Sequence, residues 1–166
     1  MKIELKNIKV TASLSEETPA YTGTVYVDGK AAFAVRNHGQ GGCDEVHPLP
    51  GYDGPGEHDV NLWLRNNVPP LVESGMELEM DLELFCHLAV DKYERRQRLD
   101  RILRSKVVIL DKHKGEDALF TMKLPRGLRP TPDVLAKVAE TRARTNAPGE
   151  VVNGNAALYE RALELV

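Results

Sequence analysis

The sequence predicts an α+β fold, because strand patterns fill the N-terminal part and helices and strands then follow without regular alternation. Hydrophobic residues recur at every second position over residues 2–12 and 20–36 and at helical spacing over residues 84–105. A doubly wound sheet would need repeated strand–helix–strand units, which are missing. The chain has 166 residues, of which 42% are hydrophobic, so it is long enough to bury a hydrophobic core.

We expect a single domain with four consecutive parts. They are a β-meander at 1–36, a loop rich in glycine and proline at 37–58, an α/β middle part at 59–124 and a helical part at 125–166.

The N-terminal meander is predicted from alternation and from one turn. Residues 2–12 form a strand whose hydrophobic phase slips by one near Lys6-Asn7, as a β-bulge would make it. Residues 20–36 form a hairpin around Asp28-Gly29, a pair that favours a type I′ turn. Ala31, Phe33 and Val35 take alternate positions along its second strand.

The segment 37–58 has no periodicity. Nine of the 23 glycine and proline residues of the chain lie between Gly39 and Gly56. Unstructured loops of this length are uncommon in compact domains and are usually functional or mobile. We therefore expect a binding loop here.

The remaining chain is predicted to hold four helices and three short strands. Residues 76–84 are ambiguous, because Met, Leu and Glu favour a helix whereas strict alternation favours a strand. The other predicted elements are helices at 58–67, 84–105, 132–144 and 156–166 and strands at 107–110, 118–124 and 151–152.

Several functional classes lack their sequence signatures. The chain contains no P-loop, dinucleotide fingerprint, His-Glu-x-x-His, EF-hand or Gly-x-Ser-x-Gly pattern. It has no apolar run of roughly 18 residues and no signal peptide pattern, so a cytoplasmic location is expected. Two free thiols, Cys43 and Cys86, fit a reducing compartment.

Three kinds of chemistry are open to the loop. His38, Cys43 and His47 offer zinc ligands at a spacing that is not that of a standard finger. The glycine-rich run could form an anion-binding nest, and Cys43 could act as a nucleophile beside a histidine. No cofactor is expected, with zinc as the less favoured alternative. The candidate binding residues are Asn37, His38, Gly39, Gln40, Gly41, Gly42, Cys43, Asp44 and His47.

Charge is segregated in the middle of the chain. An acidic stripe alternates along 77–83 and is expected to be a solvated face or an acidic binding surface. A basic run follows at 92–106, where Arg95, Arg98 and Arg101 are candidates for contacts with nucleic acid or with an acidic protein.

Several N-terminal segments resemble a family of small accessory proteins encoded by bacteriophages, prophages and mobile elements, mostly without assigned function. They are Ser-Glu-Glu-Thr at 15–18, Val-Asp-Gly-Lys at 27–30 and Asn-His-Gly-Gln-Gly-Gly-Cys at 37–43. The resemblance covers about two thirds of the chain and transfers no catalytic residue. It implies a protein of the bacterial host cytoplasm that binds a host protein, for example as an inhibitor of an antiviral defence system.

The expected function is therefore non-enzymatic protein binding. The alternatives are a small ligand, a nucleotide or a metal at the 37–58 loop, and nucleic acid at the basic helix. A homodimer is also open, because an antiparallel meander leaves strand edges that can pair.

Overall fold

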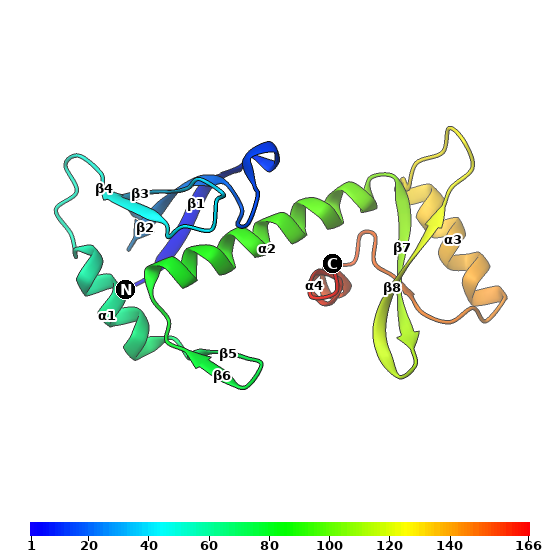
Figure 1. Ribbon diagram of the computed structural model, residues 1–166. Coiled ribbons are helices and arrows are strands. Elements are labelled where there is room, and N and C mark those ends of the chain that lie inside the picture. Colours follow the sequence, from blue (N-terminus) through cyan, green and yellow to red (C-terminus); the bar gives the residue numbers. More distant parts are fainter. The chain divides into compact units, whose positions relative to one another are not determined.

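The computed structural model describes residues 1–166 and confirms the α+β class. Where the sequence suggests one domain, the chain divides into two compact units, Met1–Tyr93 and Glu94–Val166. The boundary falls within helix α2 (Leu82–Leu103), labelled in Figure 1. Each unit has its own hydrophobic core.

Unit 1 is built on a four-stranded antiparallel sheet. Its strands follow the chain order, β1-β2-β3-β4. They span Ile3–Val10, Tyr21–Val27, Lys30–Asn37 and Glu45–Pro48, and a 3-10 helix, η1 (Ala12–Leu14), joins the first two. The predicted bulge is confirmed, because the β1–β2 register shifts between Lys6 and Lys9 and Asn7 has a φ of 56°.

The hairpin β2–β3 turns at Asp28-Gly29, as predicted. Both residues have positive φ, 49° and 82°, which a type I′ turn requires. A second bulge was not predicted. Val25 pairs with Phe33 but Tyr26 pairs with Ala31, so the extra residue Ala32 is fully buried and Ala31 is exposed. The bulge breaks the simple alternation from Ala31 to Val35, because it moves the inward position by one residue.

The 37–58 segment is not wholly without regular structure. Its residues Glu45–Pro48 form β4, which pairs with β3 over Phe33 to Arg36. Helix α1 (Glu57–Asn67) follows as predicted.

The ambiguous segment 76–84 contains both kinds of structure. Strand β6 (Met76–Leu78) pairs with β5 (Leu71–Glu73) in a small hairpin, and α2 begins at Leu82. The Asp81 carboxylate accepts a hydrogen bond from the Leu84 amide at 2.8 Å and so satisfies an unpaired donor of the first helical turn. This cap explains why the strand pattern stops where it does.

The core of unit 1 lies between the sheet and the two helices α1 and α2. Its largest fully buried side chains include Phe33 from the sheet, Leu64 from α1 and Leu82 from α2.

Unit 2 is built on a three-stranded sheet of order β8-β7-β9. The strands span Lys106–His113 (β7), Glu116–Lys123 (β8) and Glu150–Val151 (β9), and the helices Pro132–Arg144 (α3) and Ala156–Leu163 (α4). Figure 1 shows α3 and α4 on opposite sides of β7 and β8. Val108 and Leu110 pack with α4 and the end of α2, and Val107 and Ile109 are also buried. None of the helices is both long and apolar enough to cross a membrane.

Candidate functional site

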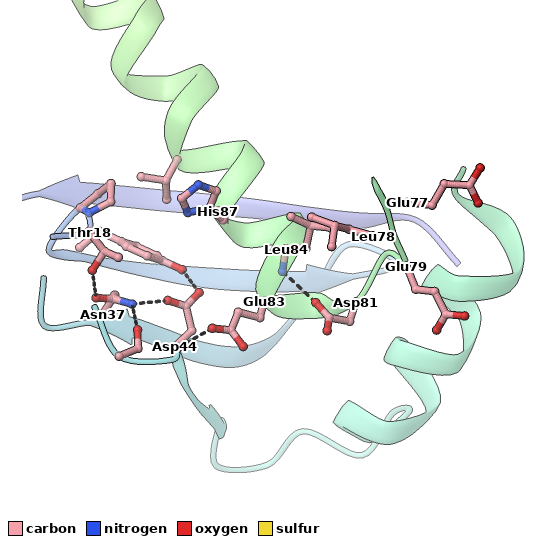
Figure 2. Close-up of a pocket in the computed structure, with 14 residues that line it drawn as sticks. Thr18, Asn37, Asp44, Glu77, Leu78, Glu79, Asp81, Glu83, Leu84 and His87 are labelled. Atoms are coloured by element: carbon pink, nitrogen blue, oxygen red, sulfur yellow. Dashed lines mark hydrogen bonds between the residues drawn. The ribbon is translucent and has the colours of Figure 1, made fainter. Parts of the chain in front are cut away.

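Asn37 organises the loop that the sequence singled out. Its side-chain amide donates hydrogen bonds to the Gly42 carbonyl and to the Asp44 carboxylate, both at 2.9 Å. Its side-chain oxygen accepts from the Thr18 hydroxyl at 3.0 Å and from the Gly39 amide at 2.8 Å. A single side chain thus closes the loop on both sides, as Figure 2 shows in part.

The two most distinctive sequence motifs fold against each other. The Gly39 carbonyl accepts hydrogen bonds from the successive amides of Glu16, Glu17 and Thr18, at 2.9, 3.0 and 3.4 Å. The Gly41 amide donates to the Thr18 hydroxyl at 3.3 Å. The Gly39 and Gly41 amides therefore already donate hydrogen bonds inside the protein, to Asn37 and Thr18. They are two of the four amides that an anion nest at 39–42 would use.

The zinc candidates do not gather around one point. His38 and His47 both lie beside the Glu45 carboxylate, at 3.2 and 3.6 Å, whereas Cys43 is exposed and makes no contact with either. Arg36 also pairs with Glu45, and its guanidinium holds the pKa of that carboxyl below its usual range. No group of three or more His, Cys, Asp or Glu side chains is placed to hold a metal ion.

Asp44 links the loop to the core. It accepts a hydrogen bond from the Tyr21 hydroxyl, and its backbone amide donates to Glu83 at 3.2 Å. Burial and the nearby Asp44 raise the pKa of Tyr21. Burial also raises the pKa of Cys86, on α2, to about 12. Both groups are therefore neutral at physiological pH, and Cys86 is not an activated thiol.

Unit 1 contains a pocket with a volume of about 430 Å³. One of its walls is formed by Thr18, Tyr21, Asn37, Gly42 and Asp44. The β5–β6 hairpin and the first turns of α2 form the rest. The lining residues are Thr18, Pro19, Tyr21, Asn37, Gly42, Asp44, Glu77, Leu78, Glu79, Asp81, Glu83, Leu84, His87 and Val90. Figure 2 shows them spread between Thr18 and Asn37 at one end and Glu77 and Glu79 at the other.

The pocket is acidic. Five lining residues are carboxylates, and none is lysine or arginine. Asp44 and Asp81 are committed to internal hydrogen bonds, and Glu79 lies 3.6 Å from Arg65. The Glu77 side chain makes no hydrogen bond or ion pair, so its carboxylate is free to meet a ligand.

The predicted binding residues divide between the lining of this pocket and the loop beside it. Asn37, Gly42 and Asp44 were predicted as binding residues and do line the pocket, whereas His38, Gly39, Gln40, Gly41, Cys43 and His47 do not. The acidic stripe supplies four of the five carboxylates. Its sequence signal was the alternation at 77–83, but nothing local indicated that it would face the 37–44 loop.

The basic candidates lie elsewhere. Arg95, Arg98 and Arg101 belong to the part of α2 in unit 2. The side chains of Arg98 and Arg101 are exposed and make no hydrogen bond or ion pair, whereas Arg95 is half-buried and has an interaction partner.

Comparisons with family models, with curated proteins and with solved structures found no match to this chain.

Proposed function

We propose that this chain is a small non-enzymatic binding protein whose acidic pocket in unit 1 takes a lysine or arginine side chain from a protein of a bacterial host. The observation that carries the proposal is the lining of the pocket. Five carboxylates line about 430 Å³, no lysine or arginine lines it, and of the five only Glu79 pairs with a cation, Arg65.

The pocket suits both parts of a long cationic side chain, its aliphatic stem and its charged head. Leu78, Leu84 and Val90 offer apolar contacts for the aliphatic stem of lysine or arginine. The carboxylates offer acceptors for the charged head, and such charge-assisted hydrogen bonds are about twice as strong as neutral ones.

The internal hydrogen bonds support binding by holding the wall in place. Asn37, Thr18 and Asp44 are tied to one another before any ligand arrives. A pre-formed wall loses little conformational entropy when a partner binds, which preserves affinity.

The identity of the partner as a host protein rests on the resemblance to phage and mobile-element accessory proteins. That context favours a host cytoplasmic target, including a component of an antiviral defence system that the protein would inhibit. Binding without a cofactor is part of the same proposal, and elemental analysis of the purified protein tests it: bound zinc would count against it.

The test compares tagged baits in bacterial lysate. The variant Glu77→Gln/Glu83→Gln removes two charges from the pocket, and glutamine at 83 keeps an acceptor oxygen for the Asp44 amide. The matched control, Glu16→Gln/Glu57→Gln, removes two exposed charges elsewhere in unit 1. We expect one partner to be retained by the wild type and the control and lost from the pocket variant.

A carbodiimide, which couples carboxylates directly to amines, makes the readout specific. For a bound lysine, we expect mass spectrometry to find a linkage from Glu77, Glu79 or Glu83 to that lysine, whereas a bound arginine would be captured without a linkage. Equal capture of the partner by all three baits, or no captured partner in several hosts, would refute the proposal.

A further inference from the structure

We infer that unit 2 carries a separate site for the phosphate groups of a nucleic-acid strand, centred on Arg104 and Arg129. This site belongs to the other unit from the acidic pocket, so it does not depend on the proposed function. Its evidence is a cavity, a pair of unpartnered guanidinium groups and an uncompensated pair of lysines.

The cavity lies where the end of α2 meets the loop after β8. It has a volume of about 540 Å³, and its lining residues are Arg104, Ser105, Gly127, Leu128 and Arg129. No acidic residue lines it. A cavity lined by two guanidinium groups favours an anion of more than one oxygen, because arginine binds phosphate through parallel N–H groups.

The two arginines of the cavity differ from the paired arginines of unit 2 in having no acidic partner. Arg96 pairs with Glu160 at 3.4 Å, and Arg161 pairs with Asp117 at 2.8 Å. Arg104 and Arg129, in contrast, make no side-chain hydrogen bond or ion pair. The helix end at Arg104 favours a cation by itself, and Arg129 comes from the loop after β8 to line the same cavity.

A pair of like charges lies next to the cavity in the sequence. Lys106, which follows Ser105, is directly opposite Lys123 in the β7–β8 ladder. Neither lysine has an ion-pair partner. Like charges in directly opposite positions destabilise a sheet. Neither lysine lines the cavity, but the pair adds positive charge next to Ser105, which does.

The cationic surface extends beyond one phosphate. Arg98 and Arg101 lead along α2 towards Arg104, and each step of three residues advances about 4.5 Å along the helix. Unit 2 as a whole has 15 Lys and Arg against 10 Asp and Glu, a net charge of +5. This row fits a strand with successive phosphates better than an isolated phosphate compound.

The experiment measures binding of a labelled single-stranded DNA of about 20 nucleotides to the full chain by fluorescence anisotropy. The variant Arg104→Gln/Arg129→Gln removes the pair. Lys137→Gln/Arg144→Gln is the matched control, because it removes two exposed cations from α3 in the same unit. Arg104→Lys/Arg129→Lys keeps the charge but loses the paired N–H geometry.

We expect the glutamine pair to weaken binding about tenfold and to lower the slope of log K against log salt by about 1.4, since each phosphate contact on a single strand contributes about 0.7. The control should stay within about twofold of the wild type, and the lysine pair should fall between the two. Duplex DNA and inorganic phosphate serve as competitors, and we expect millimolar phosphate to compete weakly.

Three results would overturn the inference. One is binding that both double glutamine variants weaken equally, which would mean attraction by bulk charge. Another is the absence of oligonucleotide binding at low salt. The third is saturable binding of inorganic phosphate with no binding of the strand.

Discussion

At the scale of single residues, Gly39 is the position where the loop has least freedom. It is buried, its φ is +85°, and a β-carbon placed on it would lie 2.2 Å from the Leu14 carbonyl oxygen. No rearrangement of a flexible side chain relieves a contact with backbone. The glycine is therefore required by the packing of the 37–43 loop against the segment before β2.

We expect Gly39→Ala to lower the free energy of unfolding by about 3 kcal/mol. The loss has two causes, because alanine is strained at this positive φ and its β-carbon overlaps the neighbouring backbone. Trp63, the only tryptophan, lies on α1 and reports the unfolding of unit 1 in urea. Gly29→Ala is the control, because φ is +82° there but no atom lies within 4 Å. It should cost only about 1–2 kcal/mol. Equal losses would mean that the contact with Leu14 is unimportant.

The buried thiol of Cys86 makes unit 1 sensitive to alkaline pH. Its pKa is about 12 in the folded protein and near the ordinary value of 9 when unfolded. Between these values the unfolded chain loses a proton that the folded chain keeps, so stability is complete below pH 9 and falls as pH rises.

We expect the free energy of unfolding to drop by about 1 kcal/mol between pH 8 and pH 10, followed by Trp63 fluorescence. Cys86→Val should remove most of this drop, whereas Cys43→Ser should leave it intact, because Cys43 is exposed. The same pH dependence in the valine variant would show that another group is responsible. Tyr21, whose pKa is also raised, adds to the effect only above pH 10.

At the scale of elements, the β7–β8 hairpin is charged unevenly along its length. At the turn end, Lys112 is opposite Asp117 and pairs with it at 2.5 Å. At the open end, Lys106 is opposite Lys123. The same ladder thus contains one favourable and one unfavourable cross-strand pair.

We expect Lys123→Glu to stabilise unit 2 by roughly 0.2–1 kcal/mol, because it turns a repulsive pair into an attractive one. Lys112→Glu, the control in the same hairpin, should destabilise it by a similar amount. Hydrogen exchange of the β7 amides measures both. A loss of stability in Lys123→Glu would mean that the open end is not under electrostatic strain.

At the scale of the whole molecule, charge differs between the two units. Unit 1 has 7 Lys and Arg against 15 Asp and Glu, a net charge of −8, whereas unit 2 carries +5. The overall charge of −3 conceals this difference. Electrostatic fields of opposite sign attract different partners, so the two units are suited to separate ligands.

We therefore expect the two sites to be separable by mutation. Glu77→Gln/Glu83→Gln should lose the protein partner and keep oligonucleotide affinity within about twofold. Arg104→Gln/Arg129→Gln should show the reverse, with oligonucleotide affinity reduced about tenfold. The four proteins compared are the wild type, the two double variants and a variant with all four changes. Pull-down measures retention of the protein partner, and fluorescence anisotropy measures oligonucleotide affinity. Loss of both activities in either double variant would mean one shared site.

Local patterns in the sequence determined most of the elements. The Asp28-Gly29 turn, the bulge near Lys6-Asn7 and the helix at 132–144 were predicted at the positions where they occur, because alternation, turn residues and an N-terminal proline act over a few neighbours. The sequence also marked the 37–43 motif, the acidic stripe and the basic helix as features of interest.

Tertiary structure alone decided what those features meet. Strand β4 exists because β3 supplies its hydrogen bonds, and Ala32 is buried because a bulge shifts its strand. The acidic stripe faces Asn37 and Asp44, and Arg129 joins Arg104, only after the chain has folded. Such pairings join residues far apart in the chain, and no periodicity within either segment encodes them. The sequence thus determined the parts, whereas long-range packing made the pocket and the cationic cavity.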